Sequence, residues 1–283
     1  MTGTQPSLPS ELCRFRRFAA PGRTADDDNA VYDLLSGRLR FAAIDSFNDP
    51  FEARPHFVAA YDGTVKQRAA VLKYLAQLAR DRGVPSARAW AVRQIAGKTQ
   101  QQIVDEVASH DDRKGLAKVV SILCLSAPEA ATRPLPWSHY ADSHRGVCIH
   151  FHTSMPPLAY ALPVAYSNEY PRILVPRSEQ DRREAVYAKL LTKCDDWKYE
   201  HEWRCIRQTH LANVRRPNLM VEWDGDTALA DPKVVKAVTF GPMMEAAARD
   251  RLTQWVLANA PHVELWRGHC HRSRFEVVRE RVS

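Results

Sequence analysis

The sequence predicts an α+β fold built from many short strands with helices between them. Two observations favour it: short apolar or alternating runs are bounded by Gly, Pro, Asn or Asp, and longer stretches repeat apolar residues at helical spacing. Both kinds of segment occur along the whole chain, without internal repeats or a clear linker. The 283 residues give ample length for a core, so we predict one α+β domain over residues 11–283.

The N-terminal part predicts two strands around one helix. Residues 1–10 are polar and contain Pro, and we expect them to be disordered. Acidic residues gather at the start of the following helix, and Gly37 provides its stop. The expected elements are a strand at 12–18, a helix at 24–37, and a strand at 39–44 that ends in a turn at 45–51.

Helical periodicity dominates residues 65–118 and predicts a helical insertion or lid. Val71, Leu75 and Leu78 recur at helical spacing between charged residues, and Gly83 helps to end that helix. Two further helices are expected at 87–96 and 99–110.

The remaining chain returns to short strands. The expected strands lie at 119–125, 146–151, 162–166, 199–205, 219–223, 237–240, 263–266 and 275–278. The expected helical segments lie at 137–142, 179–194 and 243–258.

Composition is that of a soluble globular protein, with 45% hydrophobic and 26% charged residues. No apolar run is long enough to span a membrane and the N-terminus does not resemble a secretion signal, so we expect a cytoplasmic protein. The six cysteines are scattered without a CxxC pair, which favours reduced thiols. The net charge of +7 permits contact with nucleic acid or phosphate groups; the densest basic run, 267–274 (RGHCHRSR), is equally explained as a solvated surface.

The strongest candidate for chemistry is the run 193–207 (KCDDWKYEHEWRCIR). If it is a strand, Glu200, Glu202 and Arg204 share one face, because side chains alternate along a strand. Two like charges on one face are costly to bury unless they are neutralised or line a cleft. Such a pair can stabilise positive charge, bind ribose hydroxyls or act as a base. An ion-paired ladder from Glu200 to Arg204 is the structural alternative.

Two further phrases place polar groups on rigid local structure. Residues 48–52 (NDPFE) predict a tight turn, since Asn and Asp bond to nearby backbone and Pro fixes φ. Such a turn can aim Asp49 or Glu52 into a cleft. Residues 137–140 (WSHY) place aromatic and polar groups on one turn, suited to stacking on a flat ring, although such aromatics also fill cores.

Standard metal and nucleotide motifs are absent from the sequence. Cys148, His150 and His152 share a strand face and their donor types suit zinc, but their spacing is not that of a zinc finger, so we assign no metal ligands. The absence of GxGxxG, GxxxxGK[ST] and GxSxG argues against a Rossmann cofactor, a P-loop ATPase and a nucleophile elbow.

Taken together, these phrases resemble a bacterial family known as domain-of-unknown-function family 2971. The resemblance spans about residues 12–245 and rests on the order of five phrases: an aromatic and arginine-bearing first strand, FNDPFE, a WSHYA phrase, an HRGVCI strand, and a Tyr-Glu-x-Glu-aromatic-Arg run preceded by a Lys and a Trp. They stand here at 12–15, 47–52, 135–141, 144–149 and 199–204, after Lys193 and Trp197. One departure is Pro136, where the family pattern has Met.

The layout of that family looks like the ADP-ribosyltransferase superfamily, whose members split NAD between nicotinamide and ribose. The likeness implies split mixed or antiparallel sheets with a helical insertion. It also implies a catalytic pair, in which Glu202 holds the ribose hydroxyl and stabilises an oxocarbenium-like transition state while Glu200 orients or deprotonates the acceptor. The cofactor-binding residues that it implies are Arg14 for a phosphate or ribose, Tyr140 for stacking on nicotinamide, His139 for a nearby hydrogen bond, and Asn48.

The leading hypothesis is therefore an NAD-dependent ADP-ribosyltransferase-like enzyme, of the toxin or phage-defence type. NAD is its substrate, a nucleic acid or protein is its acceptor, and no membrane is involved. Two alternatives stay open. A hydrolase or nuclease would gather Asp49, Glu52, Glu200 and Glu202 around a divalent metal, because hard cations select carboxylates. A non-catalytic module would bind nucleic acid through its basic surface and use the glutamates structurally.

Overall fold

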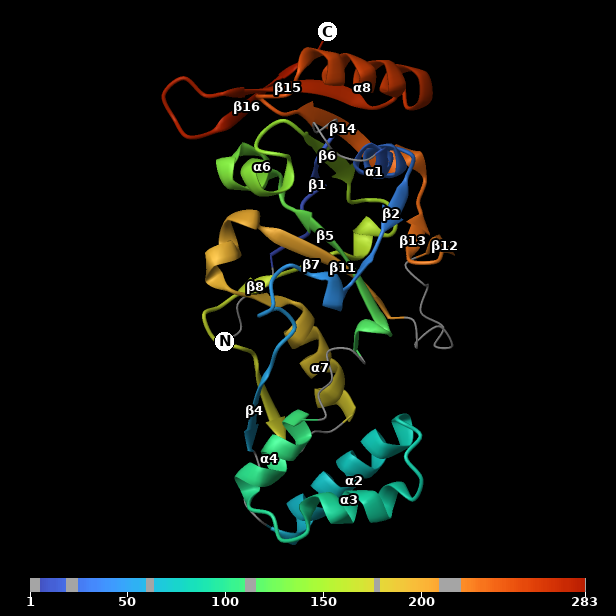
Figure 1. Ribbon diagram of the computed structural model, residues 1–283, viewed down its shortest axis with the longest axis vertical. Coiled ribbons are helices and arrows are strands. Elements are labelled where there is room, and N and C mark those ends of the chain that lie inside the picture. The colour runs from blue at the N-terminus through green and yellow to red at the C-terminus, as the bar shows by residue number, and fades with distance from the viewer. Residues whose placement is uncertain are drawn as a thin grey trace. The chain divides into compact units, whose positions relative to one another are not determined.

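The computed structural model describes residues 6–18, 25–59, 64–109, 116–175, 179–208 and 220–282. Over these ranges it combines helices with a mixed β-sheet, which confirms the α+β class (Figure 1). The chain forms two compact units. The first takes in the chain up to Ser46, Ala117–Val164 and the chain from Asp196 onward; the second takes in Phe47–Leu116 and Ala165–Asp195.

A sheet forms the centre of the first unit. Counted over the described residues, it has nine strands in the order β16-β15-β14-β6-β1-β5-β11-β7, with β3 beside β5 (Figure 1). Among the described strands of this sheet, only β14 and β15 pair in parallel. The helix α8 (Ala246–Asn259) connects them, because neighbouring parallel strands need a crossover. The strands are β1 (Glu11–Arg16), β3 (Ala42–Ala43), β5 (Val120–Ser126), β6 (Val147–His152), β7 (Leu162–Pro163), β11 (Glu202–Gln208), β14 (Val235–Phe240), β15 (Glu264–Cys270) and β16 (Val277–Arg281).

The sheet is held together least at the junction of β1 with β5. Six registered residue pairs join β1 to β6, and seven join β5 to β11. Between β1 and β5 there is a single registered pair, Cys13 with Ser126. The sheet therefore consists of two well-paired halves, and the pair of Cys13 with Ser126 joins β1 of one half to β5 of the other.

Both faces of the sheet are covered. On one face, Leu12 and Ile149 belong to a core with α1 (Ala25–Leu35) and α8. On the other face, Phe15 and Cys148 pack with α6 (Pro134–Tyr140), whose Trp137 is fully buried and meets Phe15 edge to face with ring centroids 5.2 Å apart. Alternate residues of one strand thus fill two cores, as the pleat requires.

The first unit also contains a small three-stranded sheet and several short helical turns. The sheet has the order β12-β13-β2, from Glu222–Asp224, Thr227–Leu229 and Arg38–Arg40. The short 3₁₀ helices are η1 (Ile44–Ser46), η2 (Pro128–Thr132), η3 (Leu158–Tyr160), η4 (Asp195–Glu200) and η6 (Pro232–Val234).

The second unit is mainly helical. Its helices α2 (Val65–Asp81), α3 (Ala87–Ile95) and α4 (Gln100–Ser109) bury their apolar stripes in one core, and they lie within the segment 65–118 that the sequence predicts as helical. The unit holds in addition α7 (Glu179–Leu190) and two short parallel pairs. These pairs are β4 (His56–Ala59) with β9 (Arg172–Val175), and β8 (Ala165–Tyr166) with β10 (Thr192–Lys193). None of the described helices of either unit is long and apolar enough to cross a membrane.

Some expected elements differ from those observed. The helix expected at 179–194 ends at Leu190, because β10 follows at once. The strand expected at 162–166 is two short strands, β7 and β8. The sequence does not predict β4 and β9, since each has only four residues and directly follows a proline. Residue 219 of the strand expected at 219–223 lies outside the described residues.

The expectation of disorder over residues 1–10 is wrong for its last two residues. The Thr153 hydroxyl donates to the carbonyl of Pro9, and the Thr153 N–H donates to the carbonyl of Ser10 at 3.2 Å. Residues 1–5 lie outside the described part of the chain.

A buried polar network crosses β1, β6 and β14 in the first unit. Nδ1 of His150 lies 2.7 Å from Oε1 of Glu11, and its Nε2 lies 2.9 Å from the Thr239 hydroxyl. Burial lowers the pKa of His150 even though Glu11 opposes this, so the neutral ring donates through Nδ1 and accepts from Thr239. Burial alone would raise the pKa of Glu11, but the hydrogen bonds from His150 and Lys236 outweigh it and lower the pKa to about 2.

Gly146 fixes the approach of α6 to the sheet. A Cβ at this position would lie 2.1 Å from the carbonyl oxygen of Arg16, a contact with backbone that cannot swing away. Its N–H donates to the carbonyl of Ala141 at 2.7 Å, and its own carbonyl accepts from the Gly241 N–H at 2.8 Å. The end of α6 and the start of β6 are therefore locked to β1 through a residue without a side chain.

Glu11→Gln should destabilise the protein at neutral pH and do so less in acid. The folded pKa near 2 lies below the ordinary 4.5, so the stability from Glu11 is present above pH 4.5 and is lost as the pH falls toward 2. We expect a loss of about 2 kcal/mol in the free energy of urea unfolding at pH 7, and a smaller loss at pH 3.5. The exposed Glu222→Gln serves as control and should change neither value. An equal loss at both pH values would contradict the prediction.

Gly146→Ala should cost about 3 kcal/mol of unfolding free energy, because the added methyl group meets fixed backbone. Gly225→Ala is the matched control: its φ of 56° is strained for alanine, but nothing lies within 4 Å of the new methyl group. We expect about 1 kcal/mol there, from backbone strain alone. Equal losses in the two variants, measured by urea unfolding, would show that the close contact is unimportant.

Candidate functional site

The β1–β5 junction of the first unit brings together several of the residues that the sequence singles out. Ser126 of β5 is registered with Cys13 on one side and with Glu202 of β11 on the other. Residues directly opposite one another on neighbouring strands share a face, so the three side chains form a row across the sheet. Two positions along, Arg204 lies opposite Cys124 on the same face.

Glu202 and Arg204 form a buried, two-point ion pair. Nε of Arg204 donates to one carboxylate oxygen of Glu202 at 2.7 Å, and Nη2 donates to the other at 3.0 Å. Their side chains are 3% and 1% exposed, so each charge depends on the other for compensation. The strand interpretation is correct for these two residues, which do share one face.

Glu200 reaches the site from a different element. It is the last residue of η4, and His201 with φ of 45° turns the chain before β11 begins at Glu202. The expectation that Glu200 and Glu202 project from one strand is therefore wrong for Glu200. Its carboxylate is nearly buried and accepts a short hydrogen bond of 2.5 Å from the Tyr140 hydroxyl, so α6 and η4 are tied together.

An aromatic cluster extends from this hydrogen bond toward the surface. The His139 ring lies 6.1 Å from Tyr140, 6.3 Å from Trp197 and 6.2 Å from Tyr199, measured between centroids. His139 is exposed, and the three other rings are half-buried. This cluster, Tyr140–His139–Trp197–Tyr199, thus offers flat surfaces beside the Glu200 carboxylate.

Arg14 follows Cys13 on β1, so its Cα–Cβ bond points to the face of Leu12 and not to that of the row formed by Cys13, Ser126 and Glu202. Its Nη1 atom is buried and has no hydrogen-bond partner among the residues that the structure describes. Burial lowers the pKa of this guanidinium, and the nearby Cys124 sulfur opposes the shift. A buried guanidinium nitrogen without an acceptor is costly, because its hydration has been lost without replacement.

The NDPFE phrase lies in the second unit, where it forms the expected tight turn. Oδ1 of Asp49 accepts from the Phe51 N–H at 2.8 Å, as an Asx turn does. Glu52 and Lys193 form a buried ion pair with a separation of 3.4 Å. These contacts give Asp49 and Glu52 structural roles within that unit, and Asn48 is exposed beside them.

No group of three or more His, Cys, Asp or Glu side chains in the described ranges is arranged to hold a metal ion. Of the three residues whose donor types suit zinc, Cys148 is fully buried and His150 is occupied by Glu11 and Thr239. Burial and the neighbouring Cys13 raise the pKa of the Cys148 thiol well above its ordinary value, so it is a protonated thiol at neutral pH.

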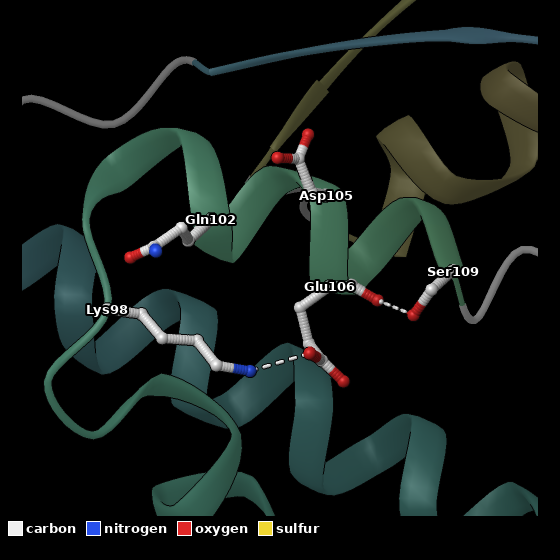
Figure 2. A pocket seen from close by; sticks show the side chains of 5 residues that line it. All are labelled: Lys98, Gln102, Asp105, Glu106 and Ser109. Carbon is white, nitrogen blue, oxygen red and sulfur yellow. Dashed lines mark hydrogen bonds and ion pairs between the residues drawn. The ribbon is translucent and has the colours of Figure 1, made fainter.

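A surface pocket on the second unit contains none of the predicted site residues. It lies beside α4 and the loop before it, lined by Lys98, Gln102, Asp105, Glu106 and Ser109 (Figure 2). Nζ of Lys98 is 2.6 Å from the Glu106 carboxylate across the pocket, and the Ser109 hydroxyl donates to the Glu106 carbonyl. Gln102 accepts from the Thr99 N–H and Asp105 from the Gln101 amide, so the polar groups of the pocket have partners within the second unit.

Comparisons of the chain with protein families, with curated proteins and with solved structures give no match.

Two residues of the junction, Cys124 and Ser126, are not among those that the sequence predicts for the site. The alternation in Leu123–Ser126 places them on one face of a strand, which is a usable signal. What the sequence does not supply is the register that sets Ser126 between Cys13 and Glu202.

The hydrogen bond between Tyr140 and Glu200 should appear as a coupling energy in a double-mutant cycle. We expect Tyr140→Phe and Glu200→Gln to be coupled by about 1–2 kcal/mol in urea unfolding at pH 7, because a charged acceptor strengthens the bond. Tyr160→Phe, at a tyrosine 40% exposed on η3, is the control and should be additive with Glu200→Gln. Additivity of Tyr140→Phe would show that the contact contributes nothing.

Proposed function

We propose that this chain is an ADP-ribosyltransferase-like enzyme of domain-of-unknown-function family 2971, and that it binds NAD at the β1–β5 junction. The observation that carries the proposal is the buried Nη1 of Arg14, which has no acceptor among the described residues. An anion that entered the junction would supply one, and the pyrophosphate of NAD has oxygens of the right charge and geometry for a guanidinium.

The sheet supports the finer fold assignment as well. A split sheet is expected for this superfamily, and here β1 and β5 share one registered pair while each is fully paired on its other side. Backbone groups that leave a ladder need other partners. β3 pairs with β5 at Ser121 and Ile122. A ligand bound between the two halves of the sheet would therefore meet backbone groups between those residues and Ser126, together with Arg14.

The chemistry of the neighbouring side chains fits the rest of the NAD molecule. Glu202 would accept hydrogen bonds from a ribose hydroxyl, with Arg204 fixing the orientation of its carboxylate. The cluster Tyr140–His139–Trp197–Tyr199 offers ring faces for nicotinamide. Asn48, in the second unit, has no part in this assignment and stays a prediction.

The proposed reaction breaks the bond between the nicotinamide nitrogen and C1′ of the ribose. The electron pair of that bond leaves with nicotinamide, and positive charge develops on the ribose ring. A carboxylate held near this charge stabilises the transition state more than the ground state, which is the condition for catalysis. The acceptor nucleophile then bonds to C1′, and its proton passes to a carboxylate, a role assigned to Glu200, and on to solvent.

Arg14→Met separates this proposal from a structural role for the arginine. If Arg14 serves a ligand, replacing its guanidinium, whose Nη1 lacks an acceptor, with an apolar chain should leave the unfolding free energy unchanged or raise it. NAD binding, measured by isothermal titration calorimetry, should weaken at least tenfold. Loss of stability with unchanged NAD affinity would contradict the assignment.

Glu202→Gln should lower the rate of nicotinamide release, followed by mass spectrometry, about 100- to 1000-fold. NAD affinity should change much less, because the carboxylate acts mainly in the transition state. The exposed Glu222→Gln is the control and should retain the full rate. The absence of any NAD binding by the unmodified protein would reject the proposed function.

A further inference from the structure

The hairpin of β15 and β16 presents a basic and aromatic tip away from the proposed NAD site. Its two strands pair over five registered positions, and the loop between them projects beyond the sheet (Figure 1). Phe275 in this loop is 94% exposed. The flanking Arg272 and Arg274 are exposed too.

The tip is held in shape by its own hydrogen bonds. The His271 N–H donates to the Glu276 carbonyl at 2.8 Å, and Nδ1 of His271 accepts from the backbone N–H groups of Ser273 and Arg274 at 3.2 and 3.1 Å. The Arg274 side chain is paired with Glu276 at 3.0 Å. The exposed ring is thus displayed on a braced loop, which reduces the entropy that binding would cost.

Arginine continues along both strands of the hairpin. Arg267 is exposed on one face of the hairpin, opposite Glu280. Arg279 and Arg281 are exposed on the other face, where Arg281 pairs with Glu264 at 3.5 Å. The Arg279 guanidinium lies 4.8 Å above the Trp266 ring. The basic residues of the hairpin are all arginine or histidine, and arginine binds phosphate in a two-point geometry and stacks on flat rings, which lysine does not.

We propose that this hairpin, Glu264–Arg281, is a binding surface for single-stranded nucleic acid. Phe275 stacks on an unpaired base, and Arg272 and Arg267 contact the phosphates, because these are the two components that single-strand binding combines. A membrane is the poorer fit: Phe275 is the single large apolar side chain between His271 and Glu276, and charged arginines stand on both sides of it. The surface does not depend on the NAD assignment; if the acceptor is a nucleic acid, the hairpin would hold it.

Fluorescence anisotropy with a labelled single-stranded oligonucleotide tests the proposal. Binding should weaken about tenfold in Phe275→Ala and in Phe275→Leu but persist in Phe275→Trp, because stacking needs a ring and not merely an apolar group. Arg272→Ala should weaken binding and reduce the dependence of the logarithm of affinity on the logarithm of salt concentration by about one unit. Phe51→Ala, at a phenylalanine 63% exposed in the second unit, is the matched control and should bind as the unmodified protein does.

The outcomes that overturn the proposal are distinct. Equal binding by Phe275→Ala and the unmodified protein would reduce the hairpin to a solvated basic surface. Sedimentation with vesicles of phosphatidylserine and phosphatidylcholine, lost in Phe275→Ala while the oligonucleotide is not bound, would assign the tip to membranes instead. Circular dichroism confirms that each variant is folded, and failure of the NAD experiments leaves these results unaffected.

Discussion

The first unit depends on how β1 is shared between its two neighbours. β6 holds it through six registered pairs, whereas β5 holds it through the one pair of Cys13 with Ser126. Beyond that pair the β1–β5 ladder stops, and the Arg14 guanidinium and the Cys124 sulfur lie near one another there. Glu202 and Arg204 follow on the next strand, set by the seven-pair register of β5 with β11. The interruption of one ladder therefore decides which side chains meet.

Elsewhere in the same sheet, the polar groups of Glu11, His150 and Thr239 satisfy one another. Glu11 accepts from His150 and from Lys236, His150 accepts from Thr239, and the resulting pKa shifts favour the charged carboxylate and the neutral ring. This network joins three strands, and within it both Glu11 carboxylate oxygens and both His150 ring nitrogens have hydrogen-bond partners. It identifies the Glu11–His150 region as a structural centre, although a glutamate, a histidine and a hydroxyl in line are also what a catalytic relay contains.

The sequence indicates long elements better than it indicates how they are placed. β5 and β6 follow from short, mainly apolar runs, and α2 follows from its repeating apolar residues. The sequence does not predict the turn between Glu200 and Glu202, because it depends on a positive φ at His201, a conformation that is expected of glycine. The sequence does not reveal the second unit either, because that unit combines two stretches that are far apart along the chain and no linker marks its boundaries. Registers such as Cys13 with Ser126 depend on long-range pairing that local patterns do not contain.

Two arginines of the sheet differ in how the fold compensates their desolvation. Arg204 is buried with both oxygens of Glu202 as acceptors, so its desolvation is offset within the fold. Arg14 stands on β1, with β5 between it and β11, and it is half-buried, yet its buried Nη1 has no acceptor among the described residues and burial lowers its pKa. For stability alone an apolar side chain would serve better at that position. Under the proposed function, the pyrophosphate of NAD would supply the missing acceptor, while Glu202 and the ring cluster would serve the ribose and the nicotinamide.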